Sequence, residues 1–168
     1  MAKTHENLWA PWRMQFIEEA QGGNTLSPFV AIYQSKDDRK NLLLFRGTYC
    51  FVVMNRYPYS NGHLLILPIA QKSELTTLSK DEHAEMLQLT GECVRILRET
   101  LHADGANCGL NFGKAAGAGI LDHLHMHVVP RWVGDSNFMP VLSGTRCMPE
   151  YLETTYDKLL PSFQKIKL

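Results

Sequence analysis

Three histidines alternate with apolar residues over positions 122–131, where the chain reads Asp-His-Leu-His-Met-His-Val-Val-Pro-Arg. Alternation with a period of two is typical of a half-buried strand. On such a strand His123, His125 and His127 would share one face, about 6 to 7 Å apart, while the apolar residues between them enter the core. Each imidazole brings two polar nitrogens that need partners, so three in a row indicate a site rather than core packing.

Two kinds of chemistry fit this row of imidazoles. Two or three ring nitrogens at this spacing can reach one divalent metal ion. Alternatively, one ring is a nucleophile toward phosphorus and its neighbours fix its tautomer and contact phosphate oxygens, because a neutral imidazole keeps a free lone pair near pH 7. A metal site usually has a further ligand or a carboxylate in its second shell. The remaining histidines have less demanding explanations than metal binding, so the nucleophile is favoured. No metal or other cofactor is expected.

Of the other histidines, His63 is a candidate for the same site. It opens a predicted strand directly after an Asn-Gly turn, where its ring could reach the row, although a purely structural role fits almost as well. His5 is close to the N-terminus, and His83 and His102 lie at opposite ends of a predicted helix. We interpret these three as solvated residues.

Residues 113–122, which lead into the histidine row, contain three glycines and Lys114. Glycine-rich loops can turn backbone N–H groups toward a phosphate, but a plain hairpin connection would have a similar composition. Both interpretations stay open. The sequence contains no G-x-S-x-G elbow, no Walker loop and no G-x-G-x-x-G after a strand.

The composition predicts one ordered domain. The chain has 168 residues, is 45% hydrophobic and has 17 basic and 17 acidic side chains, for a net charge of +0. This balance gives no electrostatic signature of a nucleic-acid or membrane partner. The N-terminus lacks the apolar core of a signal peptide and no run is long enough to span a membrane, so a cytoplasmic location is expected. Four cysteines without a C-x-x-C pair are expected to be reduced, mostly buried thiols.

The predicted elements place the candidate residues on a small antiparallel sheet. Residues 29–33 fit either a strand or a helical turn. Residues 106–112 should carry Asn107, Gly109 and Asn111 on the face that the histidines continue. A capping box at Ser79 and Glu82 starts an amphipathic helix. The expected strands cover residues 42–45, 49–54, 63–67, 106–112 and the histidine row. Three helices are expected: a short one that begins near residue 11, one over residues 80–102, and one over residues 149–160 that ends at Pro161.

Residues 123–129 match the His-φ-His-φ-His-φ-φ pattern of the histidine triad (HIT) nucleotide hydrolases and transferases, which this sequence resembles. Asn55, the Gly-His-Leu-Leu-Ile-Leu-Pro of residues 62–68 and the Asn-Phe-Gly of residues 111–113 fall where that family has companion motifs. The similarity runs over roughly residues 42–131. The flanks at residues 8–13 and 130–138 look like a bacterial branch that includes diadenosine tetraphosphate phosphorylases.

The resemblance implies roles for particular residues. His125 would attack the α-phosphorus of a nucleoside polyphosphate to give a nucleotidyl-histidine, oriented by His123 and His127 and supported by His63. Water or inorganic phosphate would then attack this intermediate. The remaining implied contacts are with the ribose and the phosphates, from Asn55, Asn111, Gly117 and Gly119. By this resemblance the substrates would be dinucleoside polyphosphates. The alternatives are a phosphoramidate or dinucleoside polyphosphate hydrolase and a nucleotide-binding module.

Two departures from the family pattern stand out. Many relatives carry Ala-Gly-Gln before the triad, whereas here Ala116 and Gly117 are followed by Ala118 and Gly119, which removes one expected phosphate donor. Some members have a zinc-binding C-x-x-C near the N-terminus, whereas residues 27–30 read Ser-Pro-Phe-Val, so a structural zinc is not expected.

The resemblance also implies the architecture: an α+β HIT-like fold with an antiparallel sheet of about five strands, a long central helix and a C-terminal helix, paired into a homodimer. A single HIT domain would span residues 1–168, with an N-terminal arm (1–28), a core that holds the triad (42–131) and a C-terminal loop and helix (132–168). Trp9 and Trp12 in the arm are expected to anchor it to the core or a partner. Trp132 could stack on a base, or serve packing or a dimer contact.

Overall fold

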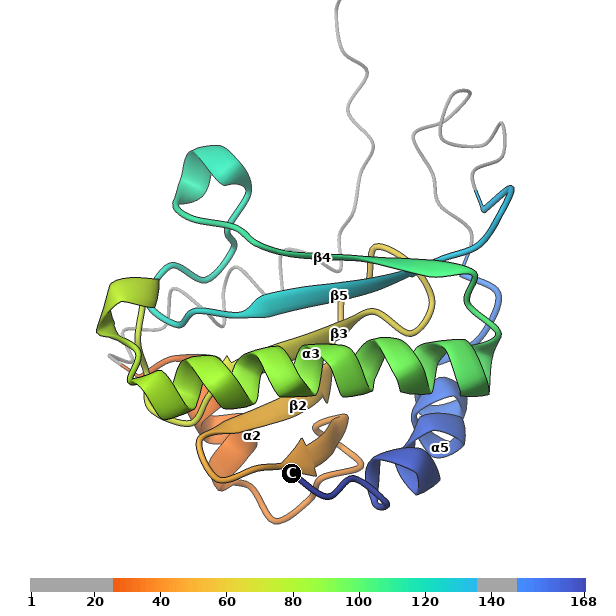
Figure 1. Cartoon of the computed structure of the whole chain (residues 1–168), viewed down its shortest axis with the longest axis horizontal. Coiled ribbons are helices and arrows are strands. Elements are labelled where there is room, and N and C mark those ends of the chain that lie inside the picture. The colour runs from red at the N-terminus through yellow and green to blue at the C-terminus, as the bar shows by residue number, and fades with distance from the viewer. Residues whose placement is uncertain (1–25, 136–147) are drawn as a thin grey trace, which may run out of the picture.

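The fold is built on one antiparallel sheet of five strands. The computed structural model describes residues 26–135 and 148–168, so the predicted helix near residue 11 and both Trp9 and Trp12 lie outside the described residues. The strand order is β1-β2-β3-β5-β4, with every neighbouring pair antiparallel. The strands are β1 (Leu43–Arg46), β2 (Cys50–Met54), β3 (Leu64–Pro68), β4 (Gly105–Leu110) and β5 (Met126–Arg131). The predicted α+β architecture is confirmed (Figure 1).

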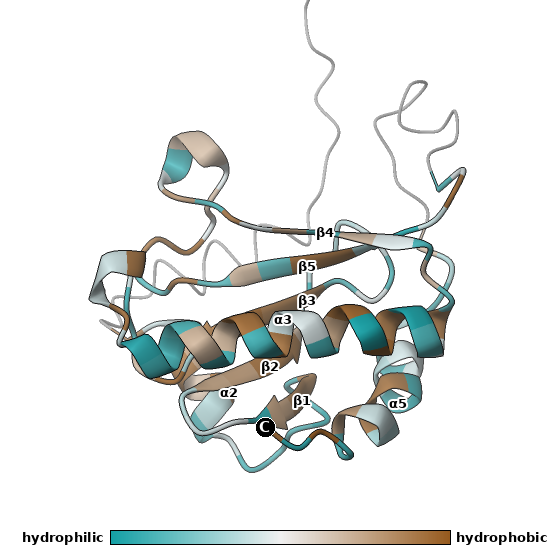
Figure 2. Cartoon of the chain, in the orientation of Figure 1, coloured by the Kyte–Doolittle hydropathy of each residue, from teal (hydrophilic) through white to brown (hydrophobic). Residues whose placement is uncertain are grey.

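The central strands are buried on both faces. All five residues of β2 and all five of β3 are buried, and the two strands appear almost continuously hydrophobic in Figure 2. A sheet with one solvated face would alternate polar and apolar residues, so continuous apolar strands indicate cover on both sides. Both sides of this sheet are indeed packed, by different helices.

The long helix α3 (Lys80–Leu101) covers one face of the sheet (Figure 1). The Ser79 hydroxyl accepts from Glu82 N at 3.1 Å while the Glu82 carboxylate accepts from Ser79 N at 2.5 Å, which is the predicted capping box. Lys72 pairs with the same carboxylate at 2.6 Å. The helix ends at His102, whose φ of 54° is left-handed. The predicted range of 80–102 is therefore correct to within a residue.

The opposite face of the sheet is covered by α2 (Pro28–Gln34), which resolves residues 29–33 as a helix rather than a strand. Ser27 caps this helix by accepting from Phe29 N at 3.3 Å, and proline is well suited to the first turn. The Phe29 ring packs in a second hydrophobic cluster with inward-facing residues of β1, β2 and β3. This smaller cluster lies beside the histidines.

The C-terminal helix α5 (Leu152–Phe163) packs against α3 and β1. It does not stop at Pro161, as the sequence predicts, but continues to Phe163. Pro161 lies in the last turn and has no N–H to donate within the helix, but this part of the helix surface is exposed to solvent. Phe163 is fully buried, and its burial favours continuing the helix. The Tyr156 hydroxyl donates to Leu43 O at 2.9 Å and fixes the helix to the first strand.

The strand that carries the histidines is shorter than predicted. β5 begins at Met126, so His123 and His125 precede it and only His127 lies on it. Leu124 N donates to Lys72 O at 2.6 Å, and this bond to a loop replaces the strand pairing predicted for that segment. Within the described residues, no helix is long and apolar enough to cross a membrane.

Candidate active site

His63 and His127 face each other across neighbouring strands. In the β3–β5 pairing, Leu64 lies opposite Val128 and Leu65 opposite His127, which brings the ring of His63 next to that of His127. His63 Nε2 lies 2.9 Å from His127 Nδ1, and both rings are buried. Gly62 makes the approach possible, because its φ is +75° and a Cβ there would lie 2.5 Å from Leu101 Cδ1.

A backbone amide fixes the tautomers of this pair. Tyr59 N–H donates to His63 Nδ1 at 3.1 Å, so that nitrogen carries a lone pair and the proton of the neutral ring is on Nε2. His63 Nε2–H then donates to His127 Nδ1, which leaves the proton of His127 on its own Nε2. The side-chain nitrogen Nδ2 of Asn111 lies 3.3 Å from His127 Nε2, and turning the amide by 180° places its oxygen there to accept from this N–H. The result is an N–H donor on His127 at the site.

His125 has the opposite polarity. Its Nδ1 lies 2.8 Å from the carbonyl oxygen of His123, and because a carbonyl only accepts, Nδ1 must carry the proton. In the neutral ring, Nε2 is then an unprotonated nitrogen with its lone pair available. The ring centroid is 4.9 Å from that of His127 and the side chain is 9% exposed. His125 therefore has the free ring nitrogen that a nucleophile needs.

His123 is oriented by the backbone of β3. Its Nε2–H donates to Pro68 O at 2.8 Å, and its ring meets Phe29 edge-on with the centroids 5.7 Å apart. Its Nδ1 is buried and has no hydrogen-bond partner in the described part of the chain. The ring is thus fixed between β3 and α2, and the backbone carbonyl of the same residue positions His125.

Burial keeps the imidazoles neutral. Desolvation, with further repulsion from His127 and His125, lowers the pKa of His63 to about 3. Desolvation also lowers the pKa of His127 to about 4, with a smaller contribution from His125. For His125 and His123 the pKa is lowered as well, chiefly by burial, although the carbonyl partner of each ring opposes the shift. All four rings are therefore neutral near pH 7.

The hydrogen bonds leave few lone pairs for a metal ion. Nδ1 of His63 and Nδ1 of His127 both accept hydrogen bonds, and Nδ1 of His123 is buried. Only His125 presents an open lone pair, and the part of the chain that the structure describes contains no cluster of three or more His, Cys, Asp or Glu side chains able to hold a metal. The arrangement favours the nucleophile over the metal alternative.

Asn55 and Asn111 lie on opposite sides of the histidine pair. The amide nitrogen of Asn55 is 3.3 Å from His63 Nδ1, and its oxygen accepts from Tyr57 N at 2.9 Å. Asn55 therefore orients His63 in this structure, a contact that the sequence did not indicate. The strand predicted over residues 106–112 ends at Leu110, so Asn111 lies just past β4, and its side chain still reaches His127 as predicted for the histidine face.

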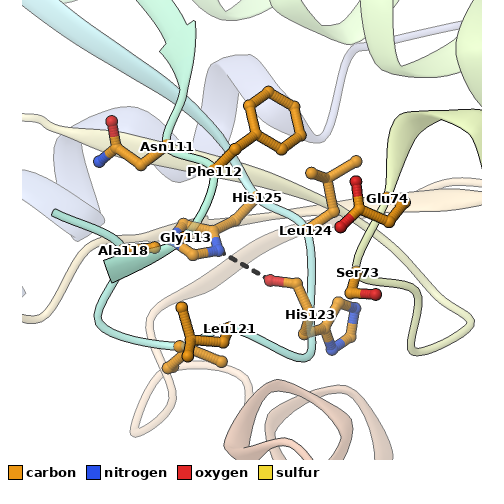
Figure 3. A pocket seen from close by; sticks show the side chains of 11 residues that line it. Ser73, Glu74, Asn111, Phe112, Gly113, Ala118, Leu121, His123, Leu124 and His125 are labelled. Carbon is orange, nitrogen blue, oxygen red and sulfur yellow. Dashed lines mark hydrogen bonds between the residues drawn. The ribbon is translucent and has the colours of Figure 1, made fainter. Parts of the chain in front are cut away.

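The glycine-rich loop passes beside His125. It contains a short 3-10 helix, Lys114–Ala116, bounded by Gly113 and Gly117, whose φ values are +74° and +87°. Gly113 and Ala118 line a pocket of about 230 Å³ that also includes Asn111 and His125 (Figure 3). Gly117 and Gly119 flank Ala118 on this loop.

Trp132 lies away from these residues, at the far end of β5. Its indole packs against the cluster under α3, and its Nε1–H donates to Leu101 O at 3.2 Å. The structure thus supports packing, rather than base stacking, for this side chain.

Three contacts around the histidines were not predicted. Phe29 lies with its ring centroid 5.5 Å from that of His125, and Tyr59 stacks on His127 at 5.7 Å with an interplanar angle of 16°. Gln71 accepts from Ser27 N at 2.9 Å and donates to Asp122 at 3.0 Å, which links α2 to the segment before His123. The Tyr-Pro-Tyr of residues 57–59 was a visible signal, but nothing in the sequence singled out Phe29 or Gln71.

The chain is similar to a known family and to several known proteins. A HIT domain model matches residues 37–133. The AP-4-A phosphorylase of Mycobacterium tuberculosis is 37% identical over 157 residues, which cover 89% of this chain and 80% of that protein. The bis(5'-adenosyl)-triphosphatase of Saccharomyces cerevisiae is 30% identical over 112 residues, 62% of this chain and 52% of that protein.

A solved structure gives the same result at the level of the fold. The crystal structure of a Zn-bound histidine triad family protein from Mycobacterium smegmatis superposes with a TM-score of 0.61 at 30% identity, covering 74% of this chain and 84% of that one. Residues 37–133, which match the HIT domain model, include all four buried histidines and make up more than half of the sequence. This chain therefore belongs to the histidine triad (HIT) family.

Proposed function

We propose that this protein cleaves dinucleoside polyphosphates, such as diadenosine tetraphosphate, through a nucleotidyl-histidine intermediate on His125. The observation that carries the proposal is the bond between His125 Nδ1–H and the carbonyl of His123, which leaves Nε2 unprotonated. A relative that is 37% identical is an AP-4-A phosphorylase, and another is a bis(5'-adenosyl)-triphosphatase.

In the first step, the lone pair of His125 Nε2 forms a bond to the α-phosphorus. The bond from phosphorus to the bridging oxygen breaks, and its electron pair leaves with the departing nucleoside polyphosphate. The hydrogen bond from His63 fixes an N–H on the other nitrogen of His127. This N–H is a preorganised donor for the negative charge that develops on the phosphate oxygens. We assign phosphate contacts to Asn111, Gly117 and Gly119. His123 orients His125, and Asn55 contacts the ribose in addition to its bond to His63.

In the second step, an acceptor oxygen attacks the phosphorus and the N–P bond breaks. We propose inorganic phosphate as the acceptor, so that a nucleoside diphosphate is released. Splitting one difficult displacement into two in-line steps is the advantage of covalent catalysis. Water as the acceptor is the second candidate, favoured by the triphosphatase relative.

We also propose that the protein is a cytoplasmic homodimer. β4 forms one edge of the sheet, and Cys108 on that strand is exposed as a free thiol. Leu87 on α3 is 71% exposed, which leaves apolar surface that a second copy could cover. Sedimentation of the purified protein tests the dimer.

Two measurements test the reaction. Wild type and His125→Ala are incubated with diadenosine tetraphosphate labelled at the α-phosphorus and quenched. Acid-labile label should appear on the wild type alone, and equal labelling of both would contradict the covalent mechanism. Adding phosphate should produce adenosine diphosphate, whereas adenosine monophosphate at every phosphate concentration would identify a hydrolase.

A further inference from the structure

The pocket beside His125 differs in character from a phosphate site. Its wall contains Phe112, Ile120, Leu121 and Leu124, which are all apolar (Figure 3). Phe112 and Leu121 are each 44% exposed, so their side chains are available at the rim. In Figure 3 they lie on opposite sides of His125.

Beyond Asn111, which we assign to a phosphate contact, the charge of the pocket wall disfavours a polyphosphate chain. None of the described residues that form it is a lysine or an arginine, and Glu74 contributes a carboxylate. Lys72, next to Ser73 in the sequence, is committed to Glu82 at 2.6 Å. A chain of phosphates would be repelled by Glu74 with no cation to compensate, whereas an uncharged aromatic group would find apolar walls and a hydrogen-bond acceptor.

The size of the pocket limits what enters it. Its volume is about 230 Å³, below the roughly 300–1,000 Å³ of sites that enclose a whole drug-sized ligand. One moiety of the substrate fits this volume, but a complete dinucleotide does not. His125 forms part of the wall, whereas His63 and His127 do not. The pocket thus adjoins the nucleophile on a side that the histidine pair leaves open.

We propose that this pocket binds the nucleoside of the departing half of the substrate, with its base against Phe112 and an amine or hydroxyl group donating to Glu74. The inference rests on the proposed function, in which Asn55, on the His63 side, contacts the nucleoside that stays attached to the α-phosphorus. The departing half must leave the phosphorus on the side away from His125 Nε2, and its far nucleoside folds back against the pocket wall. The pocket would therefore make the enzyme prefer dinucleoside over mononucleoside polyphosphates.

The test compares two substrates that differ only in the departing half, diadenosine tetraphosphate and adenosine 5'-tetraphosphate. Phe112→Ala should raise KM for the first by about 5- to 100-fold, the range expected from loss of one base–aromatic stack, and leave KM for the second unchanged. Phe112→Trp should keep the preference of the wild type. Tyr151→Ala, which removes an aromatic ring 84% exposed outside the pocket, is the matched control.

Other outcomes overturn the assignment. An equal rise in KM for both substrates would place the retained nucleoside in the pocket, and no change would leave Phe112 without a role. A fall in kcat for both would indicate that Phe112 acts only through its neighbour Asn111. If the wild type turns over neither substrate, the proposed function fails, and calorimetry then tests the pocket itself. Adenosine triphosphate should bind the wild type more tightly than inorganic triphosphate, and Phe112→Ala should reduce that difference, whereas an unchanged difference would overturn the assignment.

Discussion

The two histidines before β5 and the two that meet across β3 and β5 are held by opposite kinds of partner. His123 and His125 each donate to a backbone carbonyl. His63 instead accepts from a backbone amide and donates to His127, which fixes the proton of His127 on its other nitrogen. A carbonyl forces the proton onto the nitrogen it contacts and leaves a lone pair on the far side of the ring. An amide does the reverse, so identical side chains present a lone pair in one place and an N–H donor in the other.

The difference shows that the histidine motif alone does not assign chemistry. Burial makes all four rings neutral, and the backbone then decides which nitrogen of each carries its proton. Substitutions in one pair of histidines should leave the polarity of the other pair in place.

The largest expected effect separates the nucleophile from the donor. His125→Gln should lower kcat by at least about 10³-fold, because an amide cannot replace the lone pair of Nε2. His127→Ala should lower kcat by about 10²- to 10³-fold, the usual cost of one transition-state donor, and His127→Gln should recover part of that loss because its amide still donates. Steady-state kinetics measure all three. If His127→Gln were as inactive as His125→Gln, the assigned polarities would be wrong.

Removing His63 should have a smaller effect on the rate and a clear effect on stability. His63→Ala leaves Nδ1 of His127 buried without its donor, which should cost about 1–3 kcal/mol in the free energy of unfolding. The proton of His127 is then free to move to Nδ1, so kcat should fall by about 10- to 100-fold, less than the loss of the donor itself. Urea unfolding and kinetics on one preparation test both. Full activity in this variant would remove the pair from the mechanism.

The four neutral rings predict a pH dependence of stability. Burial lowers the pKa of His63 to about 3 and that of His127 to about 4, whereas both titrate near pH 6.5 when unfolded. Between these values the unfolded chain binds more protons, so the free energy of unfolding should fall as the pH drops from about 6.5 toward 4, by up to about 1.4 kcal/mol per pH unit for each ring. The stability contributed by the neutral rings is fully present above about pH 6.5.

Urea midpoints measured between pH 7 and pH 4.5 give the slope. His63→Ala should flatten it. His102→Asn, which replaces an exposed histidine at a left-handed position that asparagine tolerates, should leave it unchanged. A slope that is the same in all three proteins would contradict the burial argument.

The smallest effects should come from the rings that pack on each side. Phe29 contacts His123 and His125, whereas Tyr59 contacts His63 and His127. Phe29→Leu should lower the rate of formation of the nucleotidyl-enzyme by a few-fold, on the order of 1 kcal/mol, because the nucleophile loses an aromatic neighbour. Tyr59→Leu should change this step less and should instead reduce the pH slope of stability, because water reaches His63. Single-turnover labelling and urea unfolding distinguish the two, and identical behaviour would mean that the pairs are not independent.

Much of the fold followed from local patterns. Helix α3 was predicted because its capping residues and apolar spacing lie within one segment, and the five strands followed from apolar runs separated by turns. The errors occurred where a distant residue decided the outcome. Pro161 suggested a helix end, but α5 continues to Phe163, whose burial stabilises the additional residues of the helix. The histidine row suggested one continuous strand, but the contact of Leu124 N with Lys72 O keeps His123 and His125 outside β5.

The sequence by itself determined the residue types and order of the triad, the central helix and the family to which the chain belongs, because each depends on residues close together in the chain. Only the tertiary structure decided which nitrogen of each histidine holds its proton, since the deciding partners, Tyr59 N, His123 O and Pro68 O, are aimed at the rings by the folded backbone. The same holds for Phe29 and Gln71, which reach the triad from distant segments. Hydrogen-bond direction depends on the position of atoms in space, which spacing along the chain does not specify.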